Sequence, residues 1–284
     1  MTPAHLVEIV TPKKYLLNGL WLGSKRPKRA IVWVHGLGSS MFSKLKIANN
    51  LLDKDTAVLV FNNRGHDKVA SVRTTKGVYI KAGAAHEIFT DCVDDIQGAI
   101  NFARKQGAKE IFLAGHSTGS QKTAYWASKR GQSVRGIVLL GSISDFATNP
   151  KYYDKRKMRR AEKIARVYMR QGKKHELLPE SAWSWPWIAD AQRFLSLYSG
   201  DSSEEIFTYW DPIRNPRTLK SVRIPVLVLP AAKEEFADRP AKEIAAWFSK
   251  HLRKGKVVIV PRVKHSFRGG EKVVAREIRR FIKG

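Results

Sequence analysis

Short runs of consecutive apolar residues recur along the chain, separated by longer stretches in which apolar and polar residues alternate with a helical period. The first two runs, residues 5–10 and 16–22, are joined by a Pro-Lys-Lys turn and predict an antiparallel hairpin at the edge of a sheet. The later runs are apolar on both faces, which is typical of buried parallel strands. They cover residues 30–35, 57–61, 110–114, 134–140, 225–229 and 257–260.

Amphipathic stretches that predict helices lie between these runs. Residues 87–106 place apolar side chains from Ile88 to Ala103 on one stripe, as expected for a helix with one face against a core. Strands that alternate with helices predict an α/β fold with a mostly parallel sheet flanked by helices on both faces. The other stretches of this kind cover residues 42–53, 121–130 and 271–282.

One segment, residues 146–217, interrupts this alternation. It contains helical patterns and turns, including a short amphipathic stretch at 202–210, but no strand of the buried kind. An insertion of about 70 residues is too long for a plain loop. It follows the sixth predicted strand, so we expect it above the carboxyl ends of the strands, where ligands bind in open α/β sheets. We therefore predict a helical cap over residues 146–217 and a core formed by residues 1–145 and 218–284.

The composition limits the class of protein. The 284 residues are 43% hydrophobic, enough to bury a full core, which excludes intrinsic disorder as the main state. Cys92 is the only cysteine, which excludes an intrachain disulfide and a thiolate metal cluster. No apolar run reaches the ~18–20 residues of a membrane-spanning helix, and the first residues lack the pattern of a signal peptide. With no metal- or nucleotide-binding motif, the sequence predicts a cytoplasmic protein without integral membrane association, metal or cofactor.

The chain is strongly basic, with 52 Lys and Arg against 25 Asp and Glu and a net charge of +27. A basic surface attracts nucleic acid, anionic lipid or acidic substrates. The excess is spread, because residues 151–174 and 253–283 each carry 11 Lys and Arg against two acidic residues. No zinc-finger, RNA-recognition or helix-turn-helix signature accompanies it, so nucleic acid is not the leading partner. The charge is interpreted either as a compositional bias or as an anion-binding face.

The residues that point to chemistry form the pentapeptide Gly115-His116-Ser117-Thr118-Gly119, a G-x-S-x-G motif between a buried strand and a helix. A sharp strand-to-helix turn forces the central serine into a strained backbone conformation, and flanking glycines remove side chains that would collide. The hydroxyl is then held at the start of the next helix, whose dipole favours developing negative charge. The motif predicts an exposed, nucleophilic Ser117.

With this motif in its context, the chain resembles the α/β-hydrolase superfamily over nearly its whole length, and within it the capped serine esterases and lipase-like hydrolases. The resemblance implies that Ser117 is the nucleophile. Segment 35–38, with the sequence His-Gly-Leu-Gly, matches the family's oxyanion loop. The resemblance therefore also implies that the backbone N–H groups of Leu37 and Thr118 hold the oxyanion.

The resemblance implies a histidine base and a carboxylate that orients it. His265 follows the last predicted strand and resembles the family's final histidine loop. The family usually places the acid after the strand at residues 225–229, often as Gly-x-x-Asp, whereas this chain reads Pro-Ala-Ala-Lys-Glu and has Glu234 in that place. The alternatives for the acid are Glu235 and Asp238 in the same loop and Asp145 after the preceding strand.

Three indole side chains, Trp183, Trp185 and Trp187, lie within five residues of the predicted cap. Above an active site they could line an acyl or aromatic-alcohol pocket and so bind substrate. The alternative is that these rings form the small core of the cap itself.

Taken together, the resemblance implies a serine hydrolase that cleaves carboxylic esters of small molecules through an acyl-enzyme intermediate. Acyl transfer or amide cleavage on the same fold is one alternative. The other is a non-catalytic protein of this fold that binds anions or nucleic acid through its basic surface. The expected partner is a small-molecule ester substrate, with anionic ligands second.

Overall fold

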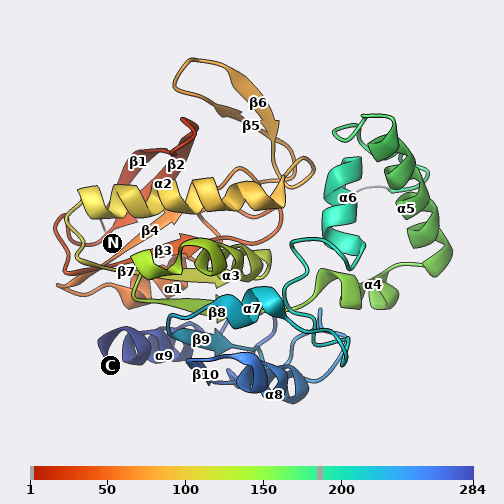
Figure 1. Cartoon of the computed structure of the whole chain (residues 1–284). Coiled ribbons are helices and arrows are strands. Elements are labelled where there is room, and N and C mark those ends of the chain that lie inside the picture. Colours follow the sequence, from red (N-terminus) through yellow and green to blue (C-terminus); the bar gives the residue numbers. More distant parts are fainter. Residues whose placement is uncertain (1–2, 184–187) are drawn as a thin grey trace.

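The computed structural model describes residues 3–183 and 188–284, and its centre is a sheet of eight strands (Figure 1). The strands are β1 (Ala4–Val10), β2 (Leu16–Leu22), β3 (Arg29–Val34), β4 (Thr56–Phe61), β7 (Glu110–His116), β8 (Gly136–Leu140), β9 (Val226–Leu229) and β10 (Gly255–Val257). Their order across the sheet is β1-β2-β4-β3-β7-β8-β9-β10. The pairs β1–β2 and β2–β4 are antiparallel, and every other neighbouring pair is parallel.

Helices cover both faces of this sheet (Figure 1). Helices α1 (Leu45–Leu51) and α9 (Glu271–Lys283) pack on one face, and α2 (Cys92–Lys105), α3 (Thr118–Arg130), α7 (Arg217–Ser221) and α8 (Ala241–His251) pack on the other. In β3, Val32 packs with the α2 and α3 side while Ile31 packs with the α1 and α9 side, and both are fully buried. A strand covered on both faces has no position facing solvent, which is why its sequence is continuously apolar. The α/β fold predicted from the sequence is confirmed.

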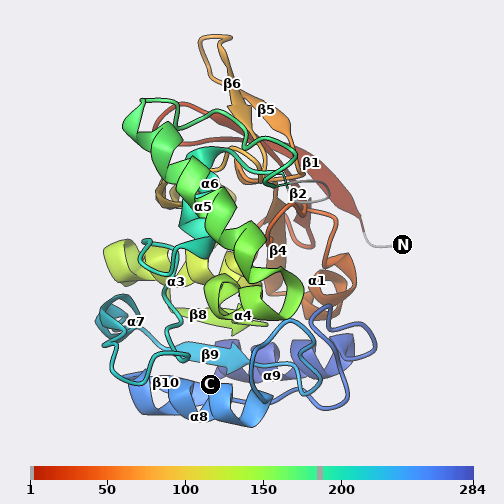
Figure 2. The same ribbon diagram turned by 90° about the vertical axis from the view of Figure 1, so that its right-hand side faces the viewer.

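Three helices follow β8, which is the sixth strand of the large sheet in chain order. They are α4 (Asp145–Tyr152), α5 (Lys155–Arg170) and α6 (Ala191–Tyr198), and two views show them standing together at one end of the sheet (Figures 1 and 2). Among the described residues they bury an apolar cluster of their own, which includes Ala161, Ala165, Leu178 and Phe194. A layer of helices that stands apart from the sheet needs an apolar cluster of its own. We therefore retain residues 146–217 as the proposed cap.

The structure differs from the sequence prediction in several places. The last strand, predicted at residues 257–260, is β10 at Gly255–Val257, and the short helix α7 was not predicted. A small hairpin of β5 (Ala70–Arg73) and β6 (Tyr79–Ala82) was not predicted, because its strands are only four residues long, largely exposed and without an apolar run. Helix α8 was also not predicted. Residues 202–210, expected to be amphipathic, form turns rather than a helix. Their apolar side chains Ile206 and Phe207 pack into the main core, where the Phe207 ring lies 5.1 Å from that of Phe248 on α8.

Candidate active site

The turn between β7 and α3 places Ser117 at the carboxyl end of the sheet. Ser117 has φ 58° and ψ −128°, a left-handed conformation that is strained for a residue with a side chain. Its N–H donates to the Leu140 carbonyl at 2.9 Å, and its own carbonyl accepts from Ser120 N–H at 2.8 Å. A Cβ on Gly119 would lie 2.3 Å from the Val34 carbonyl oxygen, so only glycine lets α3 start this close to β3. The sequence prediction of a strained serine turn is thus observed in the backbone.

The loop after β3 lies directly against this turn. A Cβ on Gly36 would be 2.8 Å from Ser117 Cβ, so a side chain there would push the loop away. Among the described contacts, neither Leu37 N–H nor Thr118 N–H donates to a protein acceptor. Thr118 is the first residue of α3, where an N–H has no intrahelical partner. The two donors expected from the sequence are therefore available beside Ser117.

Buried His35 shapes the start of this loop. Burial lowers the pKa of His35 to about 3, and nearby Lys122 adds to the effect, so the ring is neutral. Asn63 N–H donates to His35 Nε2 at 3.2 Å, which assigns the proton to Nδ1. That Nδ1 lies 2.9 Å from the Gly36 carbonyl oxygen. The neutral ring is thus hydrogen-bonded on both sides and fixes the loop.

The loops after β9 and β10 bring His265 and Glu234 together. His265 Nδ1 lies 2.9 Å from Glu234 Oε2, and the Glu234 side chain is buried. Glu235, one of the alternatives, accepts instead from the His265 backbone N–H at 2.8 Å. Asp238 pairs with its neighbour Arg239, and Asp145 accepts from Gln121 Nε2 at 3.2 Å. Of the four carboxylates considered, Glu234 is the one that contacts the imidazole.

His116, which the sequence analysis gave no role, also positions His265. Its Nε2 lies 2.8 Å from the His265 carbonyl oxygen, and the two rings are 4.8 Å apart. Burial lowers the pKa of His116 well below its usual range, so the ring is neutral and its Nε2–H donates to that carbonyl. Only a three-dimensional contact between residues 149 positions apart reveals this role.

Ser117 and His265 line one cavity of about 500 Å³, a size suited to small-molecule ligands. Leu37 and Lys44 line it from the loop after β3, and α4 lines it from the proposed cap. Within the described contacts the Ser117 hydroxyl makes no hydrogen bond. In active sites without substrate, hydrogen bonds between reacting groups are often long and tighten only when substrate binds. The lining residues contributed by α4 are Asp145, Thr148, Asn149 and Tyr152.

The predicted tryptophan cluster lies only partly within the described residues. Trp183 is buried, with its ring 4.8 Å from Tyr153, 5.0 Å from Phe194 and 5.2 Å from Tyr198. It packs inside the proposed cap, whereas Tyr153 and Tyr198 reach the cavity wall. The predicted substrate-binding residues Trp185 and Trp187 lie outside the described residues.

In the described ranges, no group of three or more His, Cys, Asp or Glu side chains is arranged to hold a metal ion. Within the same residues, no helix has the length and apolar character needed to cross a membrane.

Comparison with known proteins adds to this geometry. A family model described as serine aminopeptidase, S33, matches residues 25–269. Protein phosphatase methylesterase 1 of Candida albicans is 27% identical over 127 residues, which are 44% of this chain but only 32% of that protein. The chain thus matches about a third of the length of this curated relative.

Several solved structures share the fold. Siderophore hydrolase EstB from Aspergillus fumigatus has a TM-score of 0.72 at 15% identity, covering 99% of this chain and 97% of that one. Est1E from Butyrivibrio proteoclasticus, with ferulic acid bound, has a TM-score of 0.65 at 16% identity and 97% coverage of both chains. The Pyrococcus furiosus esterase Pf2001 has a TM-score of 0.64 at 15% identity, covering 99% and 91%. At these identities the likeness shows the fold alone.

The family match spans most of the chain and includes Ser117, Glu234 and His265. The chain therefore belongs to the family described as serine aminopeptidase, S33, a family of α/β hydrolases.

Proposed function

We propose that this hydrolase cleaves carboxylic esters through a covalent acyl-enzyme formed on Ser117. The observation that carries the proposal is the 2.9 Å contact of Glu234 with Nδ1 of His265, which lines the same cavity as Ser117. A carboxylate on Nδ1 directs the free imidazole nitrogen, Nε2, to act as a base toward a hydroxyl. The two unpaired N–H groups beside Ser117 supply the complementary oxyanion site.

The reaction follows from these positions. His265 Nε2 takes the Ser117 proton as Oγ attacks the ester carbonyl, and the negative oxygen is held by the N–H groups of Leu37 and Thr118. Each such donor is worth about 10²–10³ in rate. The imidazolium, stabilised by Glu234, returns the proton to the leaving alkoxide. Water then attacks the acyl-enzyme by the same steps and releases the acid.

The cavity favours a small ester with an apolar or aromatic part. Apolar and aromatic side chains, among them Ile143, Tyr153, Tyr198 and Phe236, form part of its wall beside eight polar side chains. The names of relatives agree with this chemistry, since one is a methylesterase and another structure contains ferulic acid. We therefore propose short-chain or aromatic carboxylic esters as the substrate class.

A fluorophosphonate probe and a series of p-nitrophenyl esters test the proposal. The wild type should be labelled, and Ser117→Ala should lose labelling together with about 10⁴–10⁶ of its kcat/KM. Glu234→Gln should lower kcat about 10³–10⁴-fold, because the imidazole loses the partner that fixes its tautomer. Glu235→Gln is the matched control, since it removes only the charge of the carboxylate that accepts from the His265 backbone N–H, and should have a far smaller effect. Labelling that persists in Ser117→Ala would exclude this serine as the nucleophile.

Amide cleavage is a second candidate, favoured by the description of the family as serine aminopeptidases. The same residues would then act on an amine leaving group, which His265 must protonate. Aminoacyl p-nitroanilides compared with the corresponding esters separate the two reactions. We expect the esters to be turned over faster, and preferential cleavage of the anilides would reverse the assignment.

A further inference from the structure

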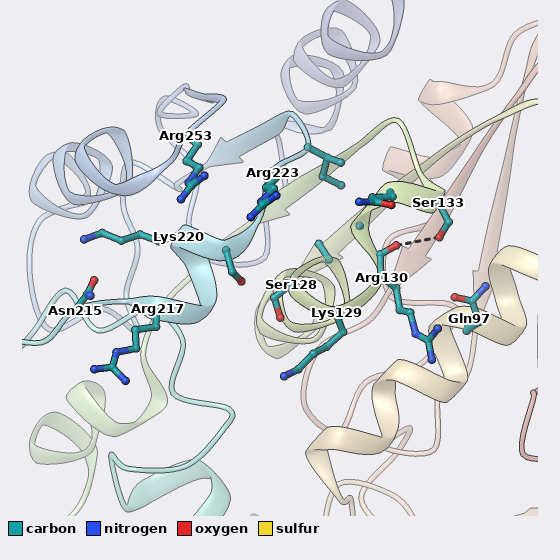
Figure 3. Close-up of a pocket in the computed structure, with 15 residues that line it drawn as sticks. Gln97, Ser128, Lys129, Arg130, Ser133, Asn215, Arg217, Lys220, Arg223 and Arg253 are labelled. Atoms are coloured by element: carbon teal, nitrogen blue, oxygen red, sulfur yellow. Dashed lines mark hydrogen bonds between the residues drawn. The ribbon is translucent and has the colours of Figure 1, made fainter.

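A hollow of about 1000 Å³ lies away from the Ser117 cavity, between α3 and α7 (Figure 3). It is lined by the last turn of α3, by the turn Gly131–Ser133, by α7, and by residues just before β9 and β10. These segments are at the amino ends of parallel strands, whereas Ser117 follows the carboxyl end of β7. Strand β7 has seven residues. At ~3.3 Å per residue, its amino and carboxyl ends lie roughly 20 Å apart. The hollow, which we call the basic hollow, is therefore separate from the candidate active site.

Its charge exceeds what the composition alone would give. Six of its fifteen lining residues are Lys or Arg, and none is Asp or Glu. At the proportions of the whole chain, 52 basic and 25 acidic in 284, a lining of this size would hold about three basic residues and one acidic residue. The basic hollow thus holds about twice as many Lys and Arg residues as the composition of the whole chain would give.

Two of the six cations have a local role. Lys129 and Arg130 belong to the last turn of α3, where positive charge offsets the helix dipole. The Lys129 Nζ also lies 5.3 Å from the centre of the Tyr125 ring. These two residues alone would not indicate a ligand.

The other four cations have no such partner. Among the described residues they form no ion pair and no side-chain hydrogen bond. Figure 3 shows them coming from α7 and from the loops above it, with Asn215 beside Arg217 and with Ser128 and Gln97 across from them, on α3 and α2. Like charges around one hollow repel each other, and a bound anion would relieve this repulsion. The four are Arg217, Lys220, Arg223 and Arg253.

The shape and lining indicate the class of anion. No aromatic side chain lines the hollow, so it offers no surface on which a nucleobase could stack. The four cations line one hollow, which suits a compact ligand rather than a long helical one. Guanidinium groups bind phosphate oxygens with short, charge-assisted hydrogen bonds. We propose that the basic hollow binds a compact anion that carries several phosphate groups, such as inorganic tripolyphosphate.

A second hollow provides a matched control. It lies at the amino ends of β3, β4 and β7 and is also basic, but its nine lining residues include Asp55. The test variant Arg217→Gln/Arg223→Gln/Arg253→Gln and the control variant Lys25→Gln/Lys28→Gln/Lys105→Gln each remove three exposed charges. Thermal midpoints should be unchanged, since all six side chains are exposed.

Binding of inorganic tripolyphosphate is measured by titration calorimetry at ~0.15 M salt, where unspecific attraction is largely screened. The test variant should bind at least about tenfold more weakly than the wild type, because each guanidinium contributes charge-assisted hydrogen bonds. The control variant should differ less than about twofold. Equal weakening in both variants would overturn the proposal in favour of general surface charge. Absence of tripolyphosphate binding by the wild type, or tighter binding of duplex DNA or anionic vesicles, would also overturn it. None of these readouts depends on ester hydrolysis.

Discussion

Burial changes the acid-base behaviour of individual side chains around the Ser117 cavity. Asp145 lines that cavity without contacting His265, and it was one of the alternatives for the acid. Burial, together with the nearby charge of Glu204, raises the pKa of Asp145 to about 6. The proposed hydrolytic steps do not use the Asp145 carboxylate. Its buried position also disfavours the charged form.

This shift predicts a pH-dependent effect of Asp145→Asn on stability. The folded pKa of about 6 lies above the ordinary value of 3.8, so the folded chain binds more protons than the unfolded chain between these values. The contribution of Asp145 to the free energy of unfolding therefore falls as pH rises from about 4 to about 6. Asp145→Asn removes the titrating group, so the variant does not lose this stability as pH rises. Relative to the wild type, the variant should gain about 2–3 kcal/mol between about pH 4 and pH 8. Urea unfolding at both pH values measures this, and an equal difference at both would contradict it.

At the scale of elements, what the sequence could predict depends on how regular the local pattern is. The buried strands were predictable because a strand covered on both faces must be apolar throughout, as in β3 and β4. The β5–β6 hairpin was not, since exposed short strands leave no such pattern. In the candidate site, the Ser117 turn follows from neighbouring residues. The family resemblance already placed Glu234 ahead of Glu235. The contacts themselves depend on side-chain directions in two loops that are distant in sequence, which no local pattern encodes.

The start of α6 illustrates how one residue can fix an element of the proposed cap. Asp190 is fully buried and caps α6 by accepting from Arg193 N–H at 2.8 Å. It also lies 3.1 Å from Nδ1 of both His86 and His175, so it connects the helix to a loop of the core.

Asp190→Ala should lower the free energy of unfolding by about 2–4 kcal/mol, since a helix cap and further buried polar contacts are lost together. Asp154→Ala is the matched control because Asp154 caps α5 in the same way but is exposed. Its cost should be about 0.5–1 kcal/mol. Urea unfolding compares the two, and equal costs would show that the buried contacts of Asp190 contribute nothing.

Across the whole molecule, a solvated surface excess of charge accompanies buried ion pairs, and one network of these reaches the proposed cap. Arg193 on α6 is fully buried, with Nη2 3.0 Å from Glu87 Oε2 and Nη1 2.5 Å from Glu204 Oε2. Glu87 Oε1 in turn lies 2.5 Å from the buried Lys122 Nζ on α3. The nearby cations lower the pKa of Glu87, although burial acts against them. This network runs from the proposed cap into the helix that begins beside Ser117.

Breaking this network should destabilise cap and core as one unit. In Glu204→Gln the buried Arg193 loses one of its two carboxylates, and a buried charge left without compensation costs about 3–5 kcal/mol. Glu162→Gln is the control, because its pair with Arg166 lies on the exposed side of α5 and should cost at most about 1 kcal/mol. Since the network joins α6 to α3, circular dichroism and tryptophan fluorescence should report a single urea transition in the Glu204 variant, shifted to lower concentration. Two separate transitions would mean that the proposed cap unfolds on its own and that the buried charges do not couple it to the sheet.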